Sequence, residues 1–366
     1  MKKLRRIALA LVVCVPACLS AQQTASPSSS TTPAAQEPTL AERPAPTTVE
    51  GKRRMTLDVV VMDRAGNPVA GLERKNFTLF DNNQPAKILS FRAIGGAPQD
   101  SDPPVEITLV LDTVNVGFQQ VAFARDEISK FLRQNGGHLV KPVSIVLLTN
   151  DGVGTHLQSS TDGNALAAQL SQLDSKLRTI TRAQGNWGDI ERFSFSMQMF
   201  GNILDGQEAK SGRKLLIWVG PGWPMLNGRA IEFNAEAQQR YFDAIVQLST
   251  RFRESHVDLY SVSPGTVDPL ASSYKEFLKG VVSVKKANPS DLALKVLATQ
   301  SGGRILGPNS DLVGQINTCV SDGSSYYMIS FDRPRADRAD EYHDLRIQID
   351  QPGLTARTNT GYYNQP

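Results

Sequence analysis

The stretch Ile107-Thr108-Leu109-Val110-Leu111-Asp112-Thr113-Val114-Asn115-Val116 decides the fold of this chain. Apolar and β-branched residues run into an aspartate, and a segment with helical spacing begins a few residues later. A near-continuous apolar run of this kind is typical of a parallel strand that is buried on both faces. Ligands of such α/β sheets bind outside the carboxyl ends of the strands. The stretch therefore predicts an α/β sheet and places Asp112 at its candidate functional edge.

Three further apolar runs, over 143–148, 214–220 and 257–262, predict more strands of the same sheet. Segments with helical spacing separate them, the first of which carries Phe118, Val121, Ile128 and Leu132 on one face. This alternation predicts a Rossmann-like domain with a mostly parallel central sheet flanked by helices. Smaller predicted elements are a strand ending near Leu157, a helix capped by Asp162, a helix around 274–278, and a helix that carries Leu292, Val296 and Leu297.

The first 21 residues have the pattern of a secretory signal peptide. Basic residues at positions 2, 3, 5 and 6 precede an apolar run over 7–15, and small residues lead to Ala21, near which we expect cleavage. The run is shorter than the roughly 20 residues that span a membrane. We therefore expect export to the periplasm or the extracellular space, with no transmembrane segment. A lipid anchor at Cys18 is the disfavoured alternative, because Pro16 fits a lipid-attachment motif badly.

Charge and composition narrow the classes of partner. The whole chain has a net charge of +3, and the four basic residues of the signal segment leave −1 on the rest. Nothing then favours binding to nucleic acid or to an anionic membrane. Residues 22–51 are rich in Pro, Ser, Thr and Ala, with almost no large apolar residue, and this composition predicts a disordered linker.

Both ends of the remaining chain have the pattern of β structure. Strands are predicted at 55–62, 77–80 and 88–91, with turns at 63–68 and 81–84, and again at 326–331 and 343–349. Neither end has enough strands to be stable alone. We therefore expect residues 52–94 and 324–363 to form one small antiparallel β domain, with the α/β domain of residues 104–322 inserted between them.

Several separated motifs resemble the von Willebrand factor type A fold, and among its members the secreted bacterial VWFA-related domain proteins that are abundant in Acidobacteria. The resemblance covers about residues 54–363, and its motifs occur in the expected order. It implies the fold described above but little about function. The motifs lie at 57–72 with Asn76 and Phe77, and at 109–112, 212–218, 221–224, 301–304, 326–327, 352–354 and 361–363.

The resemblance also implies a place for a divalent metal. Many type A domains bind Mg²⁺ or Ca²⁺ through Asp-x-Ser-x-Ser after the first strand, a threonine from a second loop, and an aspartate after the fourth strand. Here both serine positions are valine, and Gly220-Pro221 stands where the last aspartate is expected. We therefore expect no cofactor. The alternative is a weak Mg²⁺ or Ca²⁺ site of Asp112, Asn115 and Asp151, and a plainer role for Asp112 is to cap nearby backbone amides.

A protein partner is the function that we expect at this edge, contacted by Asp112, Thr113, Asn115 and Trp223. Trp223 lies in the rigid loop 221–224, and aromatic anchors dominate many protein interfaces. Its alternative role is that of an internal plug.

Signals for catalysis are weak. The chain has no Gly-x-Ser-x-Gly, His-Glu-x-x-His or Gly-x-x-x-x-Gly-Lys motif, and its four histidines are not paired at metal-ligand spacing. Cys319, on the apolar face of a predicted helix, is expected to be a buried, inert thiol. We therefore expect a non-enzymatic binding module, and a hydrolase with an unrecognised catalytic site is the alternative.

Overall fold

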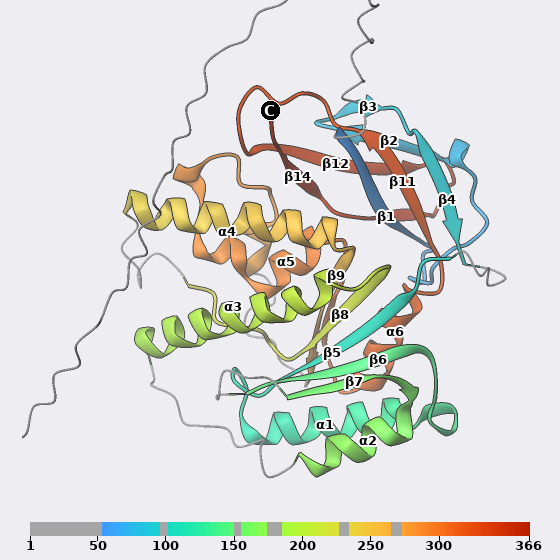
Figure 1. Ribbon diagram of the computed structural model, residues 1–366, viewed down its shortest axis with the longest axis vertical. Coiled ribbons are helices and arrows are strands. Elements are labelled where there is room, and N and C mark those ends of the chain that lie inside the picture. Colours follow the sequence, from blue (N-terminus) through green and yellow to red (C-terminus); the bar gives the residue numbers. More distant parts are fainter. Residues whose placement is uncertain (1–52, 96–101, 150–154, 174–184, 227–233, 265–272) are drawn as a thin grey trace, which may run out of the picture. The chain divides into compact units, whose positions relative to one another are not determined.

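The stretch 107–112 lies at the centre of a six-stranded sheet (Figure 1). The computed structural model describes residues 53–95, 102–149, 155–173, 185–226, 234–264 and 273–366. Strand β5 (Val105–Asp112) pairs in parallel with β6 (His138–Leu148) on one side and β8 (Arg213–Val219) on the other. Three outer strands complete the sheet: β9 (Val257–Pro264), β10 (Ile305–Asn309) and β7 (Thr155–Asp162).

The strand order in this sheet is β10-β9-β8-β5-β6-β7, and only the edge strand β7 is antiparallel to its neighbour. Along the chain, β5 is the first strand of this sheet and β8 is the fourth. The strands that follow β5 extend the sheet in one direction, and those that follow β8 extend it in the other, which is the strand order of a doubly wound fold. The strand order therefore reverses between β5 and β8. The predicted α/β architecture with a mostly parallel sheet is confirmed, and it is consistent with the type A-like fold that the resemblance implies.

Helices cover both faces of the sheet (Figure 1). Buried residues of α1 (Phe118–Leu132), α2 (Gly163–Gln172) and α6 (Leu312–Ser321) pack on one face. Those of α3 (Asn186–Glu208), α4 (Ala235–Glu254) and α5 (Leu294–Gln300) pack on the other. Three helices begin with a side chain that accepts a backbone N–H of the first turn, which satisfies a donor that the helix itself leaves unpaired. These caps are Asp162, Asn234 and Asp311, and the first confirms the prediction.

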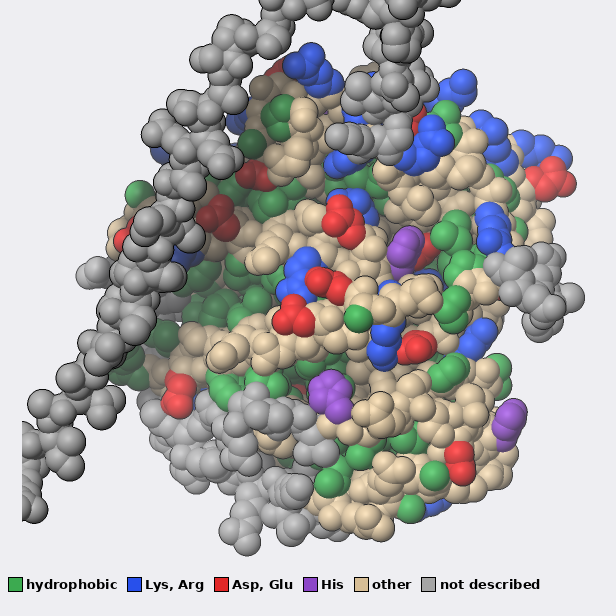
Figure 2. Space-filling model, viewed as in Figure 1, with side chains coloured by type: hydrophobic (Ala, Val, Ile, Leu, Met, Phe, Trp, Pro, Cys, Tyr) green, Lys and Arg blue, Asp and Glu red, His purple; other side chains and the backbone are tan. Residues whose placement is uncertain are grey.

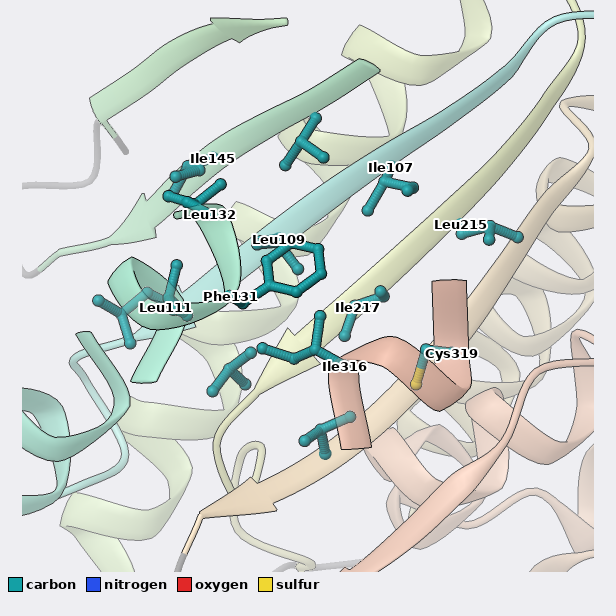
Figure 3. Close-up of a cluster of buried hydrophobic side chains, with 14 of the residues drawn as sticks. Ile107, Leu109, Leu111, Phe131, Leu132, Ile145, Leu215, Ile217, Ile316 and Cys319 are labelled. Atoms are coloured by element: carbon teal, nitrogen blue, oxygen red, sulfur yellow. The ribbon is translucent and has the colours of Figure 1, made fainter. Parts of the chain in front are cut away.

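Figure 3 shows the core on the α1 and α6 side of the sheet, where Ile107, Leu109 and Leu111 of β5 meet both helices. Cys319 of α6 is part of this core and fully buried, as predicted. Burial raises the pKa of its thiol well above the ordinary value, so the sulfur stays protonated and is a poor nucleophile.

Strands from the two ends of the chain pair with each other in two four-stranded sheets, in the orders β13-β1-β11-β4 and β14-β12-β2-β3. In the first, β1 (Arg54–Met62) and β4 (Ser90–Ile94) flank β11 (Tyr326–Asp332), and β13 (Thr355–Arg357) is an edge. In the second, β12 (Glu341–Ile349) lies between β2 (Phe77–Asp81) and β14 (Gly361–Asn364), and β3 (Gln84–Ala86) is an edge. Side chains of both sheets share one apolar core, so we call this pair of sheets the sandwich.

Both faces of strand β1 are buried, which explains its apolar character. Leu57, Val59 and Val61 point into the sandwich core. Val60, on the opposite face, belongs to the core between the central sheet and α1, and the neighbouring Asp58 binds His256 of the α/β part. The strand thus joins the two parts of the fold.

The structure corrects several predicted bounds. Strand β7 extends beyond Leu157 to Asp162 because it pairs with β6 along that length. The predicted strand at 88–91 corresponds to β4, which begins at Ser90 and extends to Ile94, and the short strand β3 at 84–86 is not among the predicted strands. The helix around 274–278 is a 3₁₀ turn, and Leu292 ends another such turn before α5 begins. The 3₁₀ turns are η2 (Arg74–Asn76), η3 (Gln134–Gly137), η5 (Ser273–Phe277), η6 (Val284–Lys286) and η7 (Pro289–Leu292).

The described surface is charged and mixed. Figure 2 shows Lys and Arg side chains scattered over this face with Asp and Glu side chains among them. Among the residues that the structure describes, no helix combines the length and apolar character needed to cross a bilayer. The predicted signal segment 1–21 and linker 22–51 lie outside the described residues.

Candidate functional site

The carboxyl ends of β5 and β8 meet where the strand order reverses, which is the usual ligand position in an open α/β sheet. We define the carboxyl edge as the loop from Asp112 to Gly117, the loop from Gly220 to Leu226, and the first turns of α1 and α3. All the predicted site residues of the described chain lie on it.

The Asp112 carboxylate is fully engaged by its own surroundings. Its Oδ1 accepts the backbone N–H groups of Val114 and Asn115, each at 3.0 Å. The Asn115 Nδ2 donates to both carboxylate oxygens, at 3.2 and 3.0 Å, and the Trp218 indole donates to Oδ2 at 3.1 Å. Asp112 is only 1% exposed. Asp112 therefore caps nearby amides, which is the plainer role suggested by the sequence. It does not offer a surface contact, because loop amides and an indole occupy its lone pairs.

A glycine closes the space beside Asp112. Gly220, directly after β8, has φ +152°, and a Cβ placed on it would lie 2.6 Å from the Cβ of Asp112. Any other residue here would collide with the aspartate. The position that carries a metal-binding aspartate in type A domains is therefore used for close packing.

These residues do not fit a divalent metal. A metal ligand must direct a lone pair at the ion, whereas the Asp112 oxygens face N–H donors. Burial raises the pKa of the Asp112 carboxyl, although the hydrogen bonds from Asn115, Val114 and Trp218 act in the opposite direction. Among the described residues, no three His, Cys, Asp or Glu side chains cluster as a metal site would require. Asp151, the third member of the alternative metal set, lies outside the described residues.

Thr113 and Asn115 connect the loop after β5 to neighbouring elements. The buried Thr113 hydroxyl donates to the Leu148 carbonyl at 2.6 Å, at the end of β6. The half-buried Asn115 also donates through Nδ2 to the hydroxyl of Ser196 on α3, at 3.1 Å. The loop is therefore fixed both to the end of β6 and to α3. Thr113, like Asp112, is too buried to contact a partner as predicted.

Trp223 is an internal plug, which corrects its prediction as a partner contact. It is 2% exposed, and its indole Nε1 donates to the Leu292 carbonyl at 2.9 Å. Its ring packs edge-on against Trp218, with centroids 5.3 Å apart, and against Phe200 at 5.4 Å. The turn at Pro221–Gly222 folds the side chain back onto the core because an apolar cluster of α3 and η7 residues receives it.

Two large aromatic residues at this edge are instead exposed. Phe118, the first residue of α1, is 63% exposed, and Trp187, the second residue of α3, is 81% exposed. Helical spacing groups Phe118 with the apolar face of α1, but residues 118–120 are exposed and the buried face of the helix begins at Val121. Trp187 was not among the predicted site residues.

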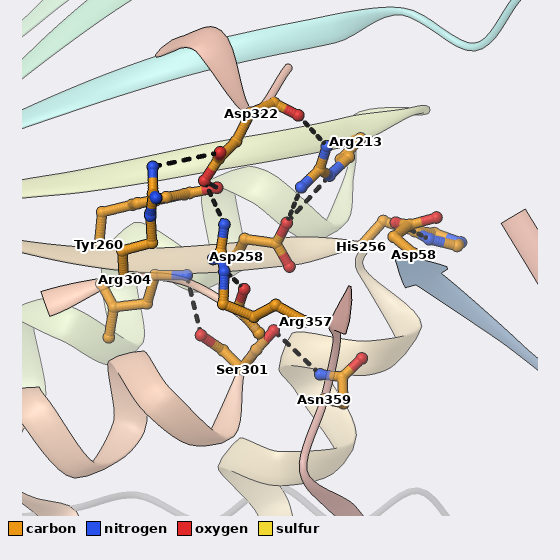
Figure 4. Close-up of polar contacts among 12 residues, drawn as sticks. Asp58, Arg213, His256, Asp258, Tyr260, Ser301, Arg304, Asp322, Arg357 and Asn359 are labelled. Carbon is orange, nitrogen blue, oxygen red and sulfur yellow. Dashed lines mark hydrogen bonds and ion pairs between the residues drawn. The ribbon is translucent and has the colours of Figure 1, made fainter. Parts of the chain in front are cut away.

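A buried ionic network lies near the amino ends of β8 and β9 (Figure 4). Arg213 binds Asp258 through two guanidinium nitrogens and donates to the Asp322 backbone carbonyl at 2.7 Å. Asp322 accepts the Tyr260 hydroxyl at 3.0 Å, binds Arg357 of β13, and lies 3.6 Å from Arg304. Because its members come from both parts of the fold, we infer that this network joins the sandwich to the α/β part.

The network explains motifs that carried the family resemblance. In the motif 301–304, the Ser301 hydroxyl accepts the Leu259 N–H at 2.9 Å, and Arg304 reaches Asp322 and the Gly66 carbonyl. A Cβ on Gly303 would lie 1.7 Å from the Leu259 carbonyl oxygen, so only glycine fits between β9 and β10. These motif residues are structural.

Two histidines form close pairs with aspartates. His256 Nδ1 lies 2.8 Å from Asp58, and His343 Nδ1 lies 2.6 Å from Asp81. A hydrolase would also need a nucleophile on the imidazole. Within the part of the chain that the structure describes, no serine or cysteine is hydrogen-bonded to either ring, so neither pair forms the triad of the hydrolase alternative.

Comparisons with known proteins give distant likenesses only. No family model and no curated protein matches the chain. An aerotolerance-related membrane protein from Bacteroides fragilis is similar over 60% of this chain and 98% of its own, with 12% identity and a TM-score of 0.36. The pilus adhesin SpaC from Lactobacillus rhamnosus GG is similar over 83% of this chain and 47% of its own, with 9% identity and a TM-score of 0.35. Manganese-loaded Plasmodium vivax TRAP protein is similar over 74% and 97%, with 9% identity and a TM-score of 0.33.

Proposed function

We propose that this chain is an exported, non-enzymatic protein-binding module that meets its partner at the carboxyl edge without a metal. One observation carries the proposal. The carboxyl edge exposes Phe118 and Trp187. Asp112, the aspartate that a metal would need, is buried, and its carboxylate oxygens already accept hydrogen bonds from the protein. The N-terminal pattern of residues 1–21 supports export.

The two aromatic residues have the properties of interface anchors. Tryptophan is among the residues that contribute most to binding energy, because a large rigid ring buries much apolar surface at a small entropic cost. Phe118 is the first residue of a helix on one face of the sheet, and Trp187 is the second residue of a helix on the other. A partner that covers the edge between the helices would contact both rings.

The buried site would then hold this surface in shape. Asp112 fixes the backbone of the loop that leads to Phe118, and Asn115 ties the same loop to Ser196 of α3, the helix that carries Trp187. A surface already fixed before binding loses less conformational entropy when a partner docks. The partner that fits is a protein with an apolar groove or patch.

Affinity capture from the native envelope and culture medium tests the proposal. The bait is compared with a double variant, Phe118→Ala with Trp187→Ala, and with Val140→Ala. Val140 is a matched control, since it is 80% exposed but lies near the amino end of β6, away from the carboxyl edge. We expect the double variant to lose the captured protein and the Val140 variant to retain it. Equal capture by all three baits would refute the proposal.

A further inference from the structure

A cavity lies between the segment of 3₁₀ turns η5 to η7 and strand β12 of the sandwich. Its volume is about 730 Å³, within the range of roughly 300–1,000 Å³ that is typical of small-molecule sites. Two aromatic rings, Phe277 and Tyr342, belong to its lining, and so does the carboxylate of Asp291. None of the lining residues belongs to the carboxyl edge, so the cavity is a separate candidate site.

Of the charged residues in the described lining, Asp291 is the one that is buried. It is 4% exposed, whereas Glu276, Lys279, Lys286 and Asp344 are exposed. The two acidic and two basic residues of the exposed set balance each other in charge, and water and salt screen them. Because Asp291 is shielded from water, its charge acts more strongly on a ligand than theirs does. The lining therefore favours a cation at Asp291.

The two oxygens of the Asp291 carboxylate have different surroundings. Oδ2 accepts the backbone N–H of Asn288 at 2.8 Å, in a capping box that fixes the side chain at the start of η7. Within the described chain, Oδ1 has no hydrogen-bond partner, and it is not among the unpartnered polar atoms that lack accessible surface. Because Asp291 lines the cavity, Oδ1 is open to a donor there.

The surroundings of this carboxyl disfavour its charged form. Burial raises the pKa of Asp291 to about 7, although the hydrogen bond from the Asn288 backbone acts in the opposite direction. A buried charge is stable when it is paired, and a ligand cation at Oδ1 would supply that pairing. A metal ion would need further ligands, and among the described residues no three His, Cys, Asp or Glu side chains cluster to provide them.

The aromatic wall of the cavity is held in place by its neighbours. The Tyr342 ring lies against the backbone at Gly280, where a Cβ would be only 1.9 Å from it, and packs on Tyr363 with centroids 5.3 Å apart. The Tyr363 hydroxyl donates to the Val281 carbonyl at 3.1 Å. An alkyl group would bury apolar surface against such a wall without the entropic cost of ordering it.

We propose that this cavity binds a small organic cation with a primary ammonium group. The ammonium donates to Asp291 Oδ1, and the alkyl part lies against Phe277 and Tyr342. A primary ammonium combines a full positive charge with N–H donors, and both complement an open carboxylate oxygen. The site uses neither the carboxyl edge nor a protein partner, so this proposal and the proposed function stand or fall separately.

The probe is butylammonium, compared with 1-butanol, which lacks the charge, and with butyrate, which has the opposite charge. Each is titrated into the full chain by isothermal titration calorimetry at pH 8, where a carboxyl with a pKa of about 7 is mostly ionised. We expect saturable binding of butylammonium and no measurable binding of butyrate. The affinity for 1-butanol should be lower by about tenfold or more, as the loss of a charge-assisted hydrogen bond predicts.

The affinity for butylammonium should also depend on pH. Protonation of Asp291 removes the charge that the ligand needs, so we expect the affinity to fall by about tenfold between pH 8 and pH 6. The other ionisable groups of the lining are the four exposed residues named above and Tyr342, whose pKa burial raises to about 12. The lining contains no histidine that would titrate in this range.

Two variants test the assignment to Asp291. Asp291→Asn removes the charge but keeps an oxygen that can accept the Asn288 N–H, so the turn stays capped. We expect it to lower the affinity for butylammonium at pH 8 by about tenfold or more and to abolish the pH dependence. Asp344→Asn removes an exposed carboxylate from the same lining and is the matched control, with a change below about twofold.

Two results with the unaltered chain would overturn the inference. One is the absence of saturable binding at tens of millimolar butylammonium, which would mean that the cavity does not hold the ion. The other is equal affinity for butylammonium and 1-butanol at pH 8, which would mean that binding does not use the carboxylate. Neither result depends on a variant that must fold.

Discussion

The indole Nε1 of Trp218 donates a hydrogen bond of 3.1 Å to the Oδ2 of Asp112 in the buried centre of the sheet. Neighbouring strands β8 and β5 supply the two residues, and the bond runs from an apolar core into the loop of the candidate site. An aspartate that completes a metal site would present its lone pairs to an ion. Here Asp112 instead accepts hydrogen bonds from the indole of Trp218 and from backbone amides of its own loop.

Asp112→Ala should therefore lower the stability of the chain. It leaves two backbone N–H groups and one indole N–H buried without their acceptor, and each costs about 1–3 kcal/mol. We expect the free energy of unfolding in urea to fall by about 3 kcal/mol or more. Trp218→Phe, which removes one donor and keeps a large ring, should cost less. A loss below about 0.5 kcal/mol for Asp112→Ala, as at an ordinary surface site, would show that this network is not structural.

Divalent metals should leave the melting temperature unchanged. A ligand that binds the folded state must raise it as the ligand concentration rises. We expect no shift in calorimetry with millimolar Mg²⁺, Ca²⁺ or Mn²⁺, because the Asp112 oxygens are occupied. A saturable increase that disappears in Asp112→Asn would instead establish the weak metal site of Asp112, Asn115 and Asp151.

The buried ionic network should contribute more than a surface ion pair. Asp322→Ala leaves Arg357, Arg304 and the Tyr260 hydroxyl without their shared acceptor in a fully buried position. Removing one partner of a buried pair costs about 3–5 kcal/mol. Arg54→Met, which removes a partly exposed bond to Asp332, is the control and should cost about 0–1 kcal/mol. Similar losses for the two variants in urea unfolding would contradict the role of the network.

The His256–Asp58 pair should make stability depend on pH. The hydrogen bond with Asp58 raises the pKa of His256, against the opposing effect of burial. A raised pKa means that the folded state holds the proton more tightly, so this stabilisation is complete below the ordinary histidine pKa of about 6.5 and is lost as pH rises through the raised value.

We therefore expect the stability of the wild type relative to His256→Asn to decline as pH rises above about 6.5. Asparagine suits the left-handed backbone here, where φ is +50°. His138→Asn, at an exposed histidine, is the control and should parallel the wild type. A difference between the wild type and His256→Asn that stays constant or grows with pH would contradict the prediction.

The sequence predicts the sheet well because its central strands are buried on both faces. An uninterrupted apolar run such as 107–111 has few alternative structures. The joining of the chain ends was also predictable, since neither β segment has enough strands to be stable alone. The predicted ends of the strands were less accurate for β7 and β4, and β3 was not predicted. The ends of these strands depend on pairing with a neighbouring strand and not on the local sequence pattern.

The candidate site was harder to predict, because exposure depends on what packs nearby. Pro221–Pro224 indicated a rigid loop, but only Phe200, Trp218 and the Leu292 carbonyl turn Trp223 inward. The ionic network was not predicted, although Arg213 and Arg304 lie in motifs that carry the family resemblance. Their partners Asp258 and Asp322 come from distant segments, so the sequence alone does not show the pairing. The absence of both serines after Asp112 indicated only that the metal-binding set of the type A kind is incomplete here.

Partner capture with and without a chelator tests the central claim most directly. The unaltered chain is used as bait on native envelope and medium in millimolar EDTA, and in parallel in millimolar Mg²⁺ and Ca²⁺. We predict the same captured protein in equal amount under both conditions, with loss only when Phe118 and Trp187 are replaced. Capture that requires the metals, or that survives replacement of both aromatic residues, would contradict this prediction.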